Sequence, residues 1–117
     1  MTNKKLGRQT AALSSPLALL SWGNVAGKKE GEGPLGNTFD YLDGDDTFGE
    51  STWEKAESAM QRQALALALN RGGLAVSQLD WLFAGDLLNQ CIGSSYAARG
   101  QDVPFFGLYG ACSTMGE

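Results

Sequence analysis

The sequence predicts an α/β fold, in which helices connect the strands of a mostly parallel sheet. A capping pattern at Ser51 opens a long stretch of helical spacing that ends at a glycine pair, Gly72 and Gly73. Two short apolar runs, DWLFAG at residues 80–85 and PFFGLY at residues 104–109, have the pattern of parallel strands covered on both faces. The 117 residues suffice for one domain at most.

Composition narrows the possible chemistry. The net charge of -4, from 9 Lys and Arg against 13 Asp and Glu, argues against nucleic-acid binding through a basic surface. No stretch approaches the roughly 18 apolar residues of a membrane-spanning helix, so membrane association is expected to be peripheral. Histidine is absent, which leaves no complete Cys-His or Ser-His-Asp machinery within these residues. The two cysteines, Cys91 and Cys112, lack zinc-site spacing and favour a reducing, intracellular compartment.

The first 50 residues are expected to hold a basic tail, one strand and one long loop. The tail covers residues 1–10 and the strand lies near residues 17–25. A secretion signal is the alternative for this region, but residues 14–16 interrupt an apolar part that would need about 7 to 15 residues. The loop covers residues 27–50, because Gly and Pro recur in it and it has neither the alternation of a strand nor the periodicity of a helix.

Two binding functions remain alternatives for this loop. Its two lysines follow a strand in a glycine-rich setting that could cradle phosphate, although the spacing of a P-loop is absent. Its acidic part could hold Ca²⁺, but Thr47 stands where an EF-hand has its third oxygen ligand. A solvated acidic loop is the simpler interpretation.

The central helix is expected to begin at Ser51, with Glu54 completing a capping box. Apolar residues recur at helical spacing over residues 53–67, and the Ala-Leu alternation over residues 64–69 makes more than one face apolar. This helix should therefore be largely buried. The glycine pair ends it, because glycine adopts the left-handed conformation without steric cost.

A strand, a shorter helix and a further strand follow. The strand at residues 80–85 leads into a helix over residues 89–99, closed by Gly100, with Cys91 expected in the core. The last strand covers residues 104–109. The complete order is βαβαβ with right-handed parallel crossovers.

The last strand runs into a turn of small residues, GACSTMG, with Cys112 at its tip. A helix is expected to start at this elbow, where the helix dipole and free amides stabilise a thiolate and favour bound anions. Ligands of open α/β sheets bind at this end of the strands. The alternative is that Cys112 is a small buried hydrophobe. Asp86, Asn89 and Gln90 follow the preceding strand on the same rim and are further pocket candidates, with ordinary helix capping as their alternative.

Four separated blocks carry a resemblance: GKKEGEGPLG, STWEKAES, LFAGDLLNQC and FFGLYGACSTM. In this order and spacing they resemble the stage V sporulation protein AD family of spore-forming bacteria, a branch of the thiolase-like superfamily, from about Leu6 to Glu117. The superfamily fold has two βαβαβ halves packed in five layers. The resemblance therefore implies that residues 1–117 form an incomplete N-terminal half, truncated at the cysteine elbow, and that the native protein continues past Glu117.

The resemblance implies a non-catalytic protein that binds dipicolinic acid and supports its uptake into the developing spore. Partners would be the other stage V sporulation A membrane proteins, and the location would be the forespore or spore, peripheral at the inner membrane. Cys112 falls on the acyl-accepting cysteine of thiolases and would mark the pocket floor, with the amides of Ser113 and Thr114 as donors to a carboxylate. Whether calcium accompanies the ligand stays open, and no cofactor is expected.

An acyl-transfer or condensing enzyme with Cys112 as nucleophile is the alternative function, because the same donors would stabilise an acyl-enzyme oxyanion. Against it, Thr114 stands where thiolases usually place Gly, and the basic partners of the cysteine lie in a second half absent here. An inactive fragment is a third possibility. Family analogy also implies a homodimer in which the last strand pairs across a two-fold axis through Phe105, Phe106, Leu108 and Tyr109; an interior strand is the alternative.

Overall fold

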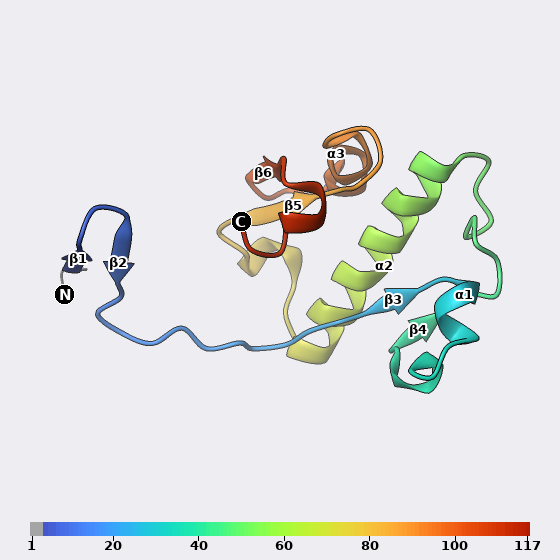
Figure 1. Cartoon of the computed structure of the whole chain (residues 1–117), viewed down its shortest axis with the longest axis horizontal. Helices are drawn as coiled ribbons and strands as arrows, with labels where there is room; N and C mark the ends of the chain where they lie inside the picture. The colour runs from blue at the N-terminus through green and yellow to red at the C-terminus, as the bar shows by residue number, and fades with distance from the viewer. Residues whose placement is uncertain (1–3) are drawn as a thin grey trace.

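The computed structural model describes residues 4–117 (Figure 1), and over these residues strands and helices alternate as an α/β fold predicts. The predicted fold class is therefore confirmed. The strands form three two-stranded sheets, one antiparallel and two parallel. The elements are β1 (Lys4–Leu6), β2 (Thr10–Ala12), β3 (Val25–Ala26), α1 (Lys28–Gly31), β4 (Tyr41–Leu42), α2 (Trp53–Gly72), β5 (Leu82–Gly85), α3 (Ile92–Ala98) and β6 (Phe105–Leu108).

The pair β5–β6 is the sheet that positions the candidate site. Its strands are parallel, with Leu82 opposite Phe105 and Gly85 opposite Leu108, and both lie within the predicted apolar runs. Helix α3 connects them and packs against α2. The expectation that β5 is covered on both faces is wrong for the described residues, because Phe83 is 59% exposed.

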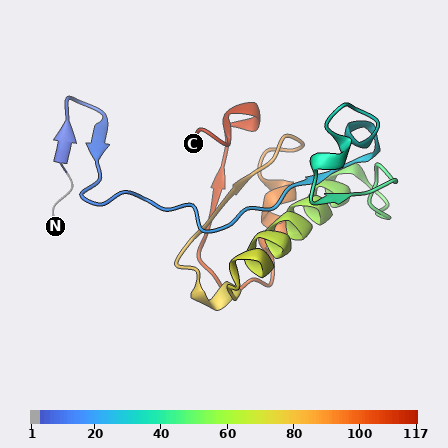
Figure 2. The ribbon, with the colours of Figure 1, turned by 90° about the horizontal axis from the view of Figure 1, so that it is seen from below.

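The predicted first strand is largely wrong. Only Val25 of residues 17–25 lies in a strand, and the chain before it runs extended toward the body without joining a sheet (Figure 2). β3 pairs in parallel with β4 instead of joining β5, so the single three-stranded sheet is replaced by separate pairs. The loop expected over residues 27–50 thus contains α1, a 3₁₀ turn and β4.

A polar cluster explains why β3 pairs with β4. Asn24 and Asp40 bond reciprocally: the Asn24 amide donates to Asp40 Oδ2 at 3.0 Å, and the Asp40 amide donates to Asn24 Oδ1 at 2.6 Å. The Arg71 guanidinium, near the end of α2, pairs with the Asp40 carboxylate and donates to the Trp22 carbonyl at 2.6 Å. The hydrogen bond and charge of Arg71, with the Asn24 amide, hold the pKa of the Asp40 carboxyl below its usual value.

The basic tail is a hairpin over its described part. β1 and β2 are antiparallel, with Lys4 opposite Ala12, and Gly7 turns the chain at φ +63°. That backbone conformation favours glycine. Residues 1–3 lie outside the described part, and both ribbon views place the hairpin apart from the helices (Figures 1 and 2).

Helix α2 begins one residue later than predicted. Thr52 rather than Ser51 is the N-cap, and its Oγ1 accepts from the Lys55 amide at 3.3 Å. The predicted end is confirmed, because Gly73 caps the helix at φ +63°. The prediction that α2 is largely buried is wrong, because its buried residues are Ala56 and Ser58. Over residues 4–117, no helix has both the length and the apolar character needed to cross a bilayer.

Candidate functional site

The loop after β5 and the turn after β6 lie at one edge of their sheet. The strands are parallel and end on facing residues, Gly85 and Leu108, so the segments that follow them leave the same edge. The Cys91 thiol joins the two by donating to the Leu108 carbonyl at 3.1 Å. The helix predicted over residues 89–99 begins only at Ile92, so Cys91 is the N-cap of α3, with φ +74°, and not a residue inside the helix.

The elbow after β6 is a 3₁₀ turn over Ala111–Ser113 rather than the start of a long helix within the described residues. Cys112 at its tip is exposed, so its assignment as a buried hydrophobe is wrong. The Ser113 amide donates to the Gly110 carbonyl at 2.8 Å, and the Thr114 amide donates to the Ala111 carbonyl at 3.2 Å. These two expected anion donors are thus engaged inside the turn, and a ligand that uses them must open it.

Thr114 carries an unpartnered polar atom behind the elbow. Its Oγ1 is buried and has no hydrogen-bond partner among residues 4–117. The hydroxyl sits over Gly85, where a Cβ would lie 2.8 Å from it and 2.7 Å from the Leu108 carbonyl oxygen. A side chain at position 85 would therefore displace the elbow. A buried hydroxyl without a partner is a hydrogen-bonding group available to a ligand.

A cavity of about 630 Å³ lies beside Gly85 and Thr114, between α2, α3 and β5. Its walls are mainly apolar, with Arg62 of α2 as the cationic residue and Phe83 as the aromatic one. Arg62 has one loose ion pair, 3.9 Å from Glu50. The lining includes Gly23, Gln61, Arg62, Leu65, Phe83, Ser94, Thr114 and Met115.

Asp86 has the capping role that sequence analysis left as its alternative. The residue is buried, and its Oδ1 accepts from the Cys91 amide at 2.7 Å. Its Oδ2 accepts from both the amide and the hydroxyl of Ser94, each at 2.8 Å. Burial raises the pKa of Asp86, but the bonds from Ser94 and Cys91 outweigh burial and leave the pKa below its usual value. The carboxylate is therefore saturated by the start of α3.

Asn89 and Gln90 lie exposed on the same loop. Both have left-handed backbone, with φ of +48° and +49°. The Asn89 side-chain amide donates to Glu54 Oε1 on α2 at 2.7 Å. Gln90 makes no side-chain hydrogen bond within residues 4–117, so its amide is the freer of the two to meet a ligand.

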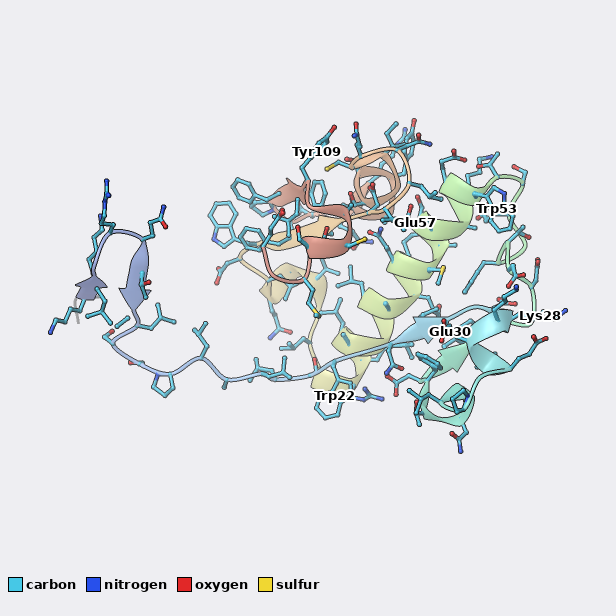
Figure 3. All side chains as sticks on the ribbon, in the orientation of Figure 1. Trp22, Lys28, Glu30, Trp53, Glu57 and Tyr109 are labelled. Carbon is cyan, nitrogen blue, oxygen red and sulfur yellow. The ribbon has the colours of Figure 1, made fainter. Side chains whose placement is uncertain are left out.

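Sequence reasoning missed the carboxylates of α2 that hold this loop. Glu57 accepts from the Leu87 amide through Oε1 at 2.9 Å and from the Leu88 amide through Oε2 at 3.3 Å. In Figure 3, Glu57 lies on α2 beside the segment that joins β5 to α3, whereas Tyr109 extends outward from the end of β6. No local pattern marks Glu57, because a glutamate on a helix usually faces solvent.

The acidic loop is organised by its own donors. Asp45 accepts from the amides of Thr47 at 3.0 Å and Gly49 at 2.9 Å, and also from the Thr47 hydroxyl. These bonds, led by the Thr47 amide, lower the pKa of Asp45. Within residues 4–117, no three His, Cys, Asp or Glu side chains gather where they could hold a metal ion.

Comparisons with known proteins identify relatives over almost the whole chain. The family model described as stage V sporulation protein AD matches residues 7–117. A stage V sporulation protein AD from Bacillus subtilis (strain 168) is 40% identical over 114 residues. That alignment covers 97% of this chain and 34% of the relative, so the chain spans about a third of the relative's length.

Proposed function

This chain belongs to the stage V sporulation protein AD family, and from that premise we propose that it serves sporulation by binding dipicolinic acid at the elbow after β6. The observation that carries the proposal is the family match, which runs through the elbow to residue 117. A sporulation protein acts in a spore-related context. The ligand, its uptake and the partners are the proposed part.

The chemistry near the elbow suits an aromatic dianion. Dipicolinate is a pyridine ring with two carboxylates, so its site needs an apolar slot and a few donors. The cavity supplies apolar walls, the Arg62 guanidinium and the unpartnered Thr114 hydroxyl. Asn89 and Gln90 add exposed side-chain amides on the neighbouring loop. Local donors are required because the chain's net charge of -4 repels a dianion at long range.

Calorimetric titration of dipicolinate into the chain tests the proposal. We expect one saturable site with a dissociation constant below about 1 mM, equivalent to roughly -4 kcal/mol. Pyridine-2-carboxylate, which has one carboxylate fewer, should bind more weakly. Cys112→Trp should weaken binding, whereas Ser77→Trp, in an exposed turn outside the site, should not. No heat at millimolar dipicolinate would refute the proposal.

We further propose that the protein acts with the other stage V sporulation A membrane proteins, peripheral at the spore inner membrane, to load dipicolinate into the spore. If calcium is carried with the ligand, it should strengthen binding, which repeating the titration with CaCl₂ measures. Co-purification of the membrane proteins with tagged protein from sporulating cells tests the partnership. Recovery of the tagged protein alone would contradict it.

A homodimer through β6 is proposed as well. Over the described residues β6 pairs only with β5, so its second edge is open to another strand. Phe106 is 49% exposed, and its ring lies 5.4 Å from that of Phe83. Phe105 and Leu108 complete the proposed interface. Gel filtration of Phe106→Asp should show monomers, and an unchanged dimer in a folded variant would refute the interface.

Acyl transfer remains the second candidate because the Cys112 thiol is exposed at the elbow. An acyl-coenzyme A would acylate this thiol in a burst and release coenzyme A. Mass spectrometry of the intact protein measures the acyl adduct, with Cys112→Ser as the control. Absence of an adduct would exclude this function for the chain.

A further inference from the structure

The segment between β5 and α3, residues 86–91, is held in a strained conformation. Asn89, Gln90 and Cys91 have φ of +48°, +49° and +74°, and none of them is glycine. Three consecutive left-handed residues with side chains persist only where the surrounding structure fixes them. The contacts that fix them therefore determine how the segment presents its side chains.

Helix α2 supplies a rigid part of those contacts. Glu57 uses both carboxylate oxygens on successive backbone amides, those of Leu87 and Leu88. Glu54, one turn earlier, accepts from the side chain of Asn89. Backbone bonds fix the path of the chain, whereas a side-chain bond fixes one rotamer. Glu57 is consequently the α2 carboxylate that sets the course of the segment.

The start of α3 is shaped around Glu57. Gly93 is buried, and a Cβ there would lie 3.1 Å from Glu57 Oε2, so glycine makes room for the carboxylate. Next to Glu57, the Ser58 hydroxyl donates to the Gly93 carbonyl at 2.8 Å and fixes α3 against α2. The segment is thus anchored to α2 on one side and to β6 through Cys91 on the other.

We propose that Glu57 is a positioning residue for the ligand site. Its two backbone bonds hold the 86–91 segment, which carries Asn89 and Gln90 and leaves the same sheet edge as the elbow. Glu57 itself does not contact the ligand. The inference rests on the proposed function, because it identifies what orients the rim of the dipicolinate site.

The test compares Glu57→Gln with Leu69→Ala in the 117-residue chain. Glutamine keeps the size of Glu57 but presents its NH₂ group to one of the two backbone amides, so one bond is lost. Leu69 lies on the same helix about three turns after Glu57, and its truncation is expected to lower stability. Dipicolinate affinity is measured by calorimetry, and amide hydrogen exchange is measured at Leu87 and Leu88.

We expect Glu57→Gln to weaken dipicolinate binding roughly 10-fold and to speed exchange at Leu87 and Leu88. Leu69→Ala should change neither the dipicolinate affinity nor the exchange at Leu87 and Leu88, even if its melting temperature falls as far as that of Glu57→Gln. Unchanged affinity or unchanged exchange in Glu57→Gln, with wild-type binding intact, overturns this inference alone. Failure of the wild-type chain to bind dipicolinate overturns it together with the proposed function.

Gly93→Ala provides a second variant should Glu57→Gln not fold. The added methyl displaces the carboxylate by a few tenths of an ångström without removing it. Binding should weaken by less than in Glu57→Gln, with faster exchange at the same two amides. Full wild-type affinity in a folded Gly93→Ala protein with displaced amide signals would overturn the positioning role.

Discussion

Replacing Asp86 with asparagine should lower the free energy of unfolding by about 2–3 kcal/mol at pH 7. One oxygen of the variant can still accept from the Cys91 amide, but its NH₂ group faces the Ser94 amide. Ser94 is fully buried, so water cannot replace the lost acceptor. A buried donor left unpaired costs about 1–3 kcal/mol, and the loss of the charge-assisted bond adds to this.

Urea denaturation followed by tryptophan fluorescence measures this loss. The control is Asp80→Asn, an exposed position where we expect a change within about 0.5 kcal/mol. The wild-type advantage should also depend on pH. Because the folded pKa of Asp86 is lowered, its stabilisation is present above the unfolded pKa of about 3.9 and is lost as the pH falls through the folded pKa. A variant equal to wild type at pH 7, or a difference that persists in acid, would refute the capping role.

Three other changes test how the chain is held together. Gly85→Ala places a Cβ 2.7 Å from the Leu108 carbonyl oxygen, so we expect a loss of about 1–3 kcal/mol by urea denaturation, and no loss would show that the elbow shifts freely. Gly23→Ala places a Cβ 2.7 Å from a carbonyl oxygen of α2 and should lower the melting temperature in a thermal scan; an unchanged melting temperature would show that the segment around residue 23 does not pack tightly on α2. Arg71→Met should raise the pKa of Asp40 toward its usual value in an NMR titration, because the hydrogen bond and positive charge of Arg71 are gone; an unchanged pKa would contradict the pairing.

The parts of the fold predicted correctly depend on local sequence. The strands β5 and β6 are short apolar runs, and Gly73 ends α2 because its left-handed conformation favours glycine. The start of α2 was misplaced by one residue because Ser51 and Thr52 are both good caps. Because these signals are local, the α/β class could be predicted without knowing any tertiary contact.

The parts that were missed depend on residues far apart in the chain. β3 meets β4 through Asn24 and Asp40. Arg71 of α2 pairs with Asp40 and donates to the Trp22 carbonyl, and no local pattern reveals these contacts. The burial of α2 was overestimated because apolar periodicity indicates which face can be covered, but does not supply the element that covers it. Spacing alone therefore favoured a continuous sheet that the described residues do not form.

The sequence predicted part of the arrangement around the elbow, and the site residues themselves stay a prediction. Sequence order placed Cys112 and Asp86 after neighbouring parallel strands, and the strand register puts both segments at one sheet edge. The left-handed backbone from Asn89 to Cys91 contains no glycine, so the sequence did not indicate it. The hydrogen bonds that Glu57 accepts join α2 to a loop far along the chain, which no local pattern predicts. Such strain becomes visible only when the contacts that maintain it are known.

The extended segment ahead of β3 makes the chain vulnerable to proteases. Leu17 and Leu19 are 85% and 81% exposed, and an extended backbone is the conformation that a protease binds in its cleft. Ser21 attaches the end of this segment to α2, because its hydroxyl donates to the Ala68 carbonyl at 2.7 Å. A protease that cleaves after leucine should therefore nick the chain before Ser21 and release the hairpin, leaving the β5–α3–β6 unit and its elbow in one piece.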